Sequence, residues 1–217
     1  YQLGMIYKNG RGVIKDIMIS LEWFEKAAEQ GHVEAQYNLA IMYETYRPVK
    51  DIMRSLEWFK KAAGQGHVEA QYNLGIMYKN GCGVGKDDII AMEWLRRAAN
   101  QGHVEAQYNL GIMHKSVTWL LRDEQKAFEW FEKAAVQGNA AAQYNLGLIY
   151  EKGQGVAKDD VKAFGWFEKA AKQGHAEAQY NLGIMYEKGR GVVKDERKAK
   201  EWYQKAADQG VRSCILM

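Results

Sequence analysis

The sequence predicts an all-α fold, a solenoid of six stacked two-helix repeats of about 36 residues each. The first observation is the spacing of six tryptophans, which lie 35 or 36 residues apart: Trp23, Trp58, Trp94, Trp130, Trp166 and Trp202. The second is a segment, GHVEAQYNLAIMY at 31–43, that returns with few changes at 66–78, 102–114 and 174–186. The third is that no segment alternates apolar and polar residues as a half-buried strand does. Internal repetition at this period is typical of repeat architectures.

The repeats predict one continuous solenoid over 1–217, although 217 residues would otherwise suggest one or two globular domains. We place the repeats at 1–35 (truncated at its N-terminus), 36–70, 71–106, 107–142, 143–178 and 179–214, with 215–217 beginning a further helix. Neither end carries the polar capping repeat that terminates a solenoid. We therefore expect the chain to be cut from a longer array, with uncapped ends that could self-associate.

The first helix of each repeat has the pattern seen at 177–189, EAQYNLGIMYEKG. On a helical wheel of the third repeat, Ala70 and Met77 lie within about 60° of Leu74, so this face is predicted to pack against the second helix. A small residue recurs in the middle of the first helix: Gly4, Ala40, Gly75, Gly111, Gly147 and Gly183. Because mid-helix glycine costs about 0.5–1 kcal/mol relative to alanine, its return predicts a tight helix–helix contact.

The second helix of each repeat has the pattern seen at 196–208, ERKAKEWYQKAAD, and follows a loop of the type GRGVVKD. An aspartate precedes it each time, where the side-chain oxygen can cap free backbone N–H groups: Asp16, Asp51, Asp87, Asp123, Asp159 and Asp195. A glycine follows it each time, at a position that tolerates a left-handed backbone: Gly31, Gly66, Gly102, Gly138, Gly174 and Gly210. Its buried side in the fifth repeat is predicted to carry Ala163, Trp166, Phe167, Ala170 and Ala171.

Three motifs follow one another in the repeats: Ala-x-Ala-Gln-Tyr-Asn-Leu-Gly-x-x-Tyr, Gly-x-Gly-Val-x-Lys-Asp, and Ala-x-x-Trp-Phe-x-Lys-Ala-Ala-x-Gln-Gly. Over essentially the whole chain they resemble the Sel-one-like repeat (SLR) family, which is related to the tetratricopeptide repeats. The resemblance implies a right-handed superhelix of helical hairpins that acts as an adaptor or scaffold for protein complexes. Two loops depart from the motif, one at 45–50 and one at 116–121, where Val117 and Trp119 replace glycines. There, either the first helix runs on or the loop has another role.

A second face of the first helices carries a tyrosine and, one turn later, an aliphatic residue. In tetratricopeptide arrays, which the repeats resemble, this face lines the concave groove in which peptides or helices bind. The resemblance therefore implies partner-binding residues at Tyr37, Ile41, Tyr72, Ile76, Tyr108, Ile112, Tyr144, Leu148, Tyr180 and Ile184. In the alternative interpretation, the same side chains pack against the next repeat and hold the solenoid together. Both interpretations stay open at this point.

The two irregular loops supply a second group of candidate partner-binding residues. Trp119, Leu120 and Leu121 together would form an exposed apolar patch of the kind that anchors protein interfaces. Tyr46, in the other irregular loop, is a further candidate. Alternatively, these side chains cover the helical hairpin and order the loop.

Composition and spacing exclude several other function classes. The net charge of +3, from 30 basic and 27 acidic residues, is too balanced to indicate nucleic-acid binding. No apolar run approaches 18 residues, so no membrane span is expected. Four of the five histidines follow the turn glycine, one to a repeat, and packed helices lie about 8–10 Å apart, too far to share a zinc ion. Because no nucleophile, base and orienting residue converge, we expect no catalytic residue, metal or cofactor.

The sequence therefore predicts a non-enzymatic scaffold that binds a protein or peptide partner. The first alternative is a structural or self-associating spacer within a larger protein. The second is a hydrolase or β-lactam-binding enzyme, because the chain resembles a family with such a cysteine-rich branch. That branch pairs cysteines within each repeat, whereas this chain has only Cys82 and Cys214. Few cysteines and no signal peptide in this stretch favour the cytoplasm. The residues at 214–217 match a prenylation box, although their register also fits the start of a seventh repeat.

Overall fold

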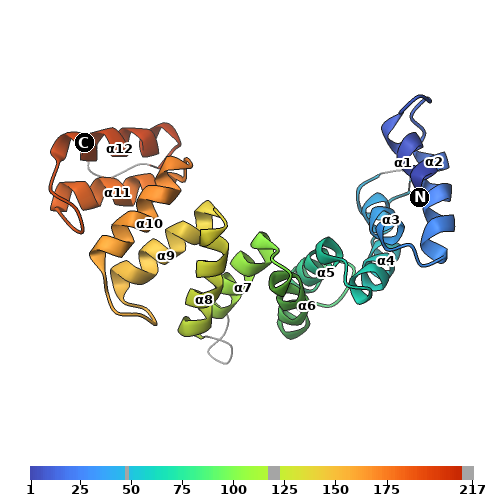
Figure 1. Ribbon diagram of the computed structural model, residues 1–217, viewed down its shortest axis with the longest axis horizontal. Coiled ribbons are helices and arrows are strands. Elements are labelled where there is room, and N and C mark those ends of the chain that lie inside the picture. The colour runs from blue at the N-terminus through green and yellow to red at the C-terminus, as the bar shows by residue number, and fades with distance from the viewer. Residues whose placement is uncertain (47–48, 117–122, 212–217) are drawn as a thin grey trace. The chain divides into compact units, whose positions relative to one another are not determined.

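The computed structural model describes residues 1–46, 49–116 and 123–211, and within these residues it contains twelve α-helices and no β-strand (Figure 1). The helices alternate as the first and second helix of each repeat, which confirms the predicted all-α solenoid. They are α1 (Gln2–Asn9), α2 (Ile17–Glu29), α3 (Val33–Thr45), α4 (Ile52–Gly64), α5 (Val68–Asn80), α6 (Asp88–Asn100), α7 (Val104–Ser116), α8 (Glu124–Val136), α9 (Ala140–Lys152), α10 (Asp160–Lys172), α11 (Ala176–Lys188) and α12 (Glu196–Asp208).

The chain forms two compact units, Tyr1–Ala106 and Gln107–Met217. In the first unit, each helix from α1 to α6 packs against the next one along the chain. In the second unit, the same holds from α8 to α12. Within each unit, therefore, consecutive repeats contact one another, which is the arrangement that defines a solenoid.

The second helices begin and end where the sequence predicts. Asp87 Oδ1 accepts hydrogen bonds from the backbone N–H groups of Ile89 and Ile90, both at 2.9 Å. The same type of cap is made by Asp16, Asp51, Asp123, Asp159 and Asp195. After α4 the chain turns at Gly66, whose φ of +93° lies in the left-handed region that favours glycine. The repeated Asp and Gly are thus the start and stop signals of these helices.

The first helices begin with a cap that the sequence pattern did not predict. His67 Nδ1 accepts a hydrogen bond from the backbone N–H of Ala70 at 3.2 Å. Before α9, Asn139 takes the place of the histidine, and its Oδ1 accepts from the N–H of Ala142 at 2.8 Å. The same cap is made by His32, His103 and His175. Four of the histidines therefore have a structural role: each accepts a hydrogen bond from a backbone N–H group that would otherwise be unpaired at the start of a helix.

The core of each repeat lies between its two helices. Of the residues predicted on the buried side of α10, Phe167 and the three alanines are buried, whereas Trp166 is only half-buried. The predicted tight contact is present at the recurring small residue of the first helix. A Cβ placed on Gly147 would lie 2.5 Å from two ring carbons of Phe167, a distance that real Cβ atoms do not show. Ring and helix backbone are therefore in direct contact.

A glutamine on the first helices links neighbouring helices through their backbones and side chains. Gln143 of α9 is 5% exposed, and its Nε2 donates to the carbonyl oxygen of Ala135 in α8 at 3.1 Å. Its Oε1 accepts from Nε2 of Gln173, the C-cap of α10, at 2.8 Å. Equivalent glutamine pairs are Gln36–Gln65, Gln71–Gln101, Gln107–Gln137 and Gln179–Gln209. These bonds satisfy a buried amide that would otherwise destabilise the fold.

The irregular loop of the second repeat starts where the other loops start. Helix α3 has 13 residues, as α5 does, so the expected alternative that the first helix runs on there is wrong. The backbone N–H of Asp51 donates to the carbonyl of Tyr43 at 2.8 Å, just as Asp87 donates to Tyr78 in the third repeat. The shortened loop therefore returns the chain to the same place at the start of α4.

Candidate functional site

The tyrosines predicted to bind a partner are all half-buried, and their rings pack on other rings, in three cases on the histidine of the next first helix. The ring of Tyr144 lies 5.8 Å from that of Phe167 in its own repeat and stacks at 4.6 Å on His175, the cap of the next first helix. Equivalent ring contacts are Tyr37 with Phe59 and His67, Tyr72 with His103, Tyr108 with Phe131, and Tyr180 with Tyr203. Packing therefore takes up one part of each tyrosine, as the alternative interpretation expects, and leaves another part accessible.

The hydroxyl groups of two tyrosines also reach the following repeat. The phenol of Tyr37 lies close to the side chain of Asn73, and that of Tyr144 lies close to the side chain of Asn181. Burial raises the pKa of both phenols above the usual value of 10, and neighbouring glutamates add to the shift. Both phenols therefore stay neutral near pH 7.

The aliphatic partners of the tyrosines are half-buried as well. Ile41 packs against the apolar cluster that contains Phe59 and Leu74, and Leu148 packs against the cluster around Phe167. We use the name tyrosine–aliphatic stripe for two sets of residues, one in each unit. The first set is Tyr37, Ile41, Tyr72 and Ile76; the second is Tyr108, Ile112, Tyr144, Leu148, Tyr180 and Ile184.

Polar side chains at the edge of the stripe are tied into contacts between first helices. Lys115 Nζ donates to Asn145 Oδ1 at 2.8 Å, and Asn145 Nδ2 donates to the carbonyl of Ala141 at 2.8 Å. Lys8 and Asn38 form the same bond in the first unit at 2.8 Å. Burial lowers the pKa of Lys115 and of Lys8. These lysines therefore stabilise the stacking of repeats, and the stripe itself is mainly aromatic and aliphatic.

Of the candidate residues in the irregular loops, the structure describes only Tyr46. Trp119, Leu120 and Leu121 lie outside the described residues, as do Cys214 and Met217. Tyr46 is half-buried at the C-terminal end of α3, where its ring packs against the apolar cluster around Phe24 and Leu39. Tyr46 is therefore partly used in packing, as the alternative interpretation expects for these loops.

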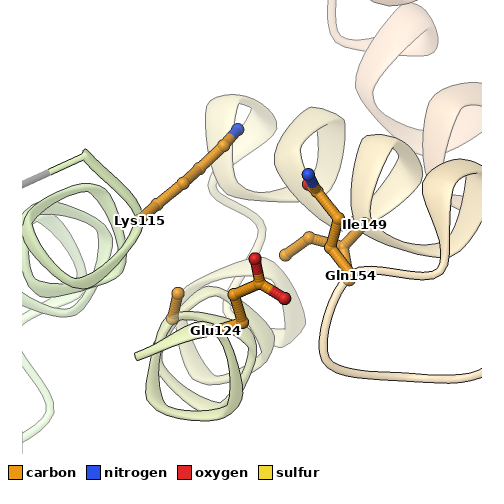
Figure 2. A pocket seen from close by; sticks show the side chains of 5 residues that line it. Lys115, Glu124, Ile149 and Gln154 are labelled. Carbon is orange, nitrogen blue, oxygen red and sulfur yellow. The ribbon is translucent and has the colours of Figure 1, made fainter. Parts of the chain in front are cut away.

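A small pocket in the second unit lies among α7, α8, α9 and the loop after α9. Figure 2 shows Lys115 reaching from α7 and Glu124 from the start of α8 towards Ile149 and Gln154. Its volume is about 140 Å³, below the roughly 300–1,000 Å³ of sites for drug-sized ligands. The described lining residues include a lysine and a carboxylate, and none of those described is a Ser, Cys or His nucleophile. The pocket therefore gives no basis for a catalytic assignment.

Metal binding, disulfide bonding and membrane spanning can each be judged for the part of the chain that the structure describes. No three His, Cys, Asp or Glu side chains there come close enough to hold a metal ion. Cys82, in the loop after α5, is exposed and not in a disulfide. None of the described helices is both long enough and apolar enough to cross a bilayer.

His175, which stacks on Tyr144, makes stability depend on pH. Burial lowers the pKa of His175 below the 6.5 of a free histidine, although Glu177, 3.2 Å away, opposes the shift. Protonation of Nδ1 would also remove the cap on Ala178. The unfolded chain then binds the proton at a higher pH than the folded chain does. This contribution to stability is present above about pH 6.5 and is lost as the pH falls through the lower folded pKa.

His175→Asn is therefore expected to reduce the loss of stability between pH 7.5 and pH 5. Asn139 makes the same cap in the preceding first helix and does not titrate, so the variant has a natural precedent within the chain. Urea unfolding of wild type and variant at both pH values measures the effect. The other histidines are the same in both proteins, so the comparison isolates residue 175. Equal acid-induced losses in the two proteins would contradict the assignment.

Comparison with known proteins assigns the repeats. The model of the Sel1 repeat matches six consecutive segments, 1–32, 33–67, 68–103, 104–139, 140–175 and 176–211. None of the curated proteins matches the chain. Among solved structures, a protective antigen present in uropathogenic Escherichia coli strains and displaying an SLR fold is 37% identical, with a TM-score of 0.90. The match covers 96% of this chain but 45% of the antigen, so this chain spans less than half of that protein.

Two further solved structures extend the comparison. A Sel1 repeat protein from Oxalobacter formigenes is 30% identical with a TM-score of 0.75, and the match covers 98% of this chain and 85% of that one. An immunity protein from Pseudomonas aeruginosa is 24% identical with a TM-score of 0.53 over 98% of this chain and 85% of that one, which shows a shared fold. With six matched repeats along its length, this chain belongs to the Sel1 repeat family.

Proposed function

We propose that this chain is a scaffold that binds an extended peptide or a helix of a partner protein along the tyrosine–aliphatic stripe. The observation that carries the proposal is the return of a half-buried tyrosine and a half-buried aliphatic side chain on consecutive first helices. Proteins of the Sel1 repeat family are commonly protein-interaction scaffolds, and this all-helical fold is typically non-enzymatic. We extend this common role to one surface, the tyrosine–aliphatic stripe, and to one kind of partner, an extended peptide or a helix.

The chemistry of the stripe suits a peptide better than a small molecule. A tyrosine buries a large ring at a low cost in side-chain entropy and keeps a hydroxyl for polar contacts. The rings are already held in place by stacking, as Tyr144 is between Phe167 and His175. Such preorganisation reduces the entropy lost on binding. An elongated partner with apolar side chains at regular spacing would meet several repeats of one unit at once.

Substitution of the aliphatic members tests the proposal without removing the packed rings. We expect Leu148→Lys with Ile184→Lys to weaken binding of a peptide selected on the wild-type protein by about tenfold or more, because a charge replaces an apolar contact. The matched control is Val161→Lys with Val193→Lys, which makes the same changes at residues 68% and 85% exposed outside the stripe. The peptide is first selected from a random library on the wild-type protein. Fluorescence anisotropy then measures its affinity for the stripe variant and for the control variant.

The outcomes separate the proposal from its main competitor. If the stripe variant stays folded and binds the selected peptide as tightly as the control does, the stripe is not the binding surface. If no library peptide binds, the structural spacer is favoured, because the tyrosines then serve only the ring contacts between repeats. Light scattering across a range of protein concentrations tests the self-associating form of that alternative.

A further inference from the structure

The residue before the repeated tryptophan differs in one repeat only. It is glutamate in five second helices, Glu22, Glu57, Glu93, Glu129 and Glu201, and it is Gly165 in α10. Glycine inside a helix costs about 0.5–1 kcal/mol relative to alanine. A Cβ on Gly165 would meet no atom within 4 Å, so close packing does not require the glycine, in contrast to Gly147. Gly165 therefore removes a carboxylate without any gain in packing.

The glycine opens a notch on the surface between α9 and α10. Tyr150, Lys162, Gly165, Trp166 and Lys169 line this space, whose volume is about 340 Å³. Lys162 Nζ lies 5.2 Å from the centre of the Tyr150 ring, and Lys169 Nζ lies 4.0 Å from the centre of the Trp166 ring. The two ammonium groups thus stand over an aromatic floor, an arrangement in which cations are held by the faces of the rings.

The charge of the notch follows from the missing glutamate. A carboxylate at 165 would lie one turn from both lysines, and a Glu four residues before a Lys pairs well on a helix surface. Of the nearest acidic groups, Asp159 at the start of α10 partly balances the charge of Lys162, whereas Glu168 is paired outside the notch. Asp159 accepts the capping N–H of Lys162 and its other oxygen lies 3.7 Å from Lys162 Nζ, while Glu168 is paired with Lys172 at 2.9 Å. The notch therefore carries an excess of positive charge.

We propose that this notch binds an acidic side chain of a partner protein. The carboxylate would lie between the ammonium groups of Lys162 and Lys169, and the methylene groups of the ligand would lie on the Trp166 ring. The missing Glu is replaced by one from the partner, which explains why a glycine stands at this one position. Tyr150 comes two residues after Leu148 and so lies on the other side of α9 from the stripe. Binding at the notch is therefore independent of the proposed stripe.

The direct test is a titration of the full chain with an N-acetylated pentaglutamate peptide and with pentaglutamine of the same length. We expect the acidic peptide to shift the indole N–H resonance of Trp166 in a saturable way, and the neutral peptide to leave it unchanged. Trp166→Phe assigns the resonance. In Gly165→Glu the affinity for pentaglutamate is expected to fall about tenfold or more. This variant restores the residue of the other five repeats, so its fold is secure.

The sixth repeat offers the reciprocal experiment. There Lys198 Nζ lies 5.3 Å from the Tyr186 ring and Lys205 Nζ lies 4.1 Å from the Trp202 ring, with Glu201 between them in sequence. We expect Glu201→Gly to create a second site, seen as a new saturable shift of Trp202. Circular dichroism verifies the helix, and Glu201→Ala replaces it if the glycine unfolds α12.

Three results would overturn the proposal. The first is the absence of a Trp166 shift with pentaglutamate. The second is an equal shift in Gly165→Glu. The third is a tighter response to a single-stranded oligonucleotide than to the peptide, which would make the ligand a nucleic acid. The stripe variants Leu148→Lys and Ile184→Lys are expected to leave the Trp166 titration unchanged, so failure at one surface is distinguishable from failure at the other.

Discussion

Gly191→Ala is expected to destabilise the sixth repeat by about 3 kcal/mol or more, the largest effect that we predict for a single methyl group. Gly191, in the loop between α11 and α12, has a φ of +67°, a conformation that costs about 1–2 kcal/mol for other residues. Its added Cβ would overlap the carbonyl oxygen of Asp160 and lie 2.5 Å from the carbonyl carbon, at the start of the preceding second helix. Because both partners are backbone, neither can move aside cheaply.

Gly12→Ala separates the cost of the left-handed backbone from the cost of the overlap with Asp160. Gly12 is the equivalent residue of the first repeat, with a φ of +73°, but a Cβ there would meet nothing within 4 Å. We expect Gly12→Ala to lower the free energy of unfolding only by the cost of the left-handed backbone, about 1–2 kcal/mol. Urea unfolding gives both free energies, and amide hydrogen exchange locates the loss in α11 and α12. Equal losses in the two variants would show that the contact with Asp160 contributes nothing.

This comparison also shows what repetition in a sequence can and cannot predict. The motif Gly-x-Gly returns in four loops, so a glycine requirement is visible in the sequence. The reason for it is not, because Gly83, Gly155 and Gly191 are constrained by the preceding repeat, whose residues lie about 30 positions earlier. Recurrence identifies a position that matters, whereas the partner of that position emerges only when the repeats are stacked.

The same limit explains the other differences between sequence and structure. The aspartate caps and turn glycines were predictable because the groups they serve lie within a few residues. The histidine caps are equally local, and their place directly before four of the first helices was a signal that could have revealed them. The bond from Gln173 to Gln143 spans 30 residues and was not predictable from spacing. For the stripe, periodicity placed the tyrosines on one face but could not show that a histidine covers part of the ring of Tyr37, Tyr72 and Tyr144.

Gly147→Ala is expected to destabilise the fifth repeat by about 1–3 kcal/mol, although alanine is the better helix former. The Cβ would lie 2.5 Å from Cδ1 and Cε1 of Phe167, a ring that is fully buried and cannot turn away into solvent. Either the ring leaves its preferred rotamer or α9 moves away from α10, and both weaken the packing of the repeat core. Urea unfolding followed by circular dichroism measures the change.

Gly165→Ala, the same substitution on α10, is the matched control and is expected to have the opposite sign. A Cβ at Gly165 meets nothing within 4 Å, so only the gain in helix propensity of about 0.5–1 kcal/mol remains. The second repeat provides the converse case, because Ala40 occupies the small position and lies in the same buried cluster as Phe59. Ala40→Gly is expected to destabilise, since it loses helix propensity and leaves a methyl-sized gap. If Gly147→Ala instead stabilises the protein as Gly165→Ala does, the small residue is not required by the Phe167 ring, and the recurrence of glycine needs another cause.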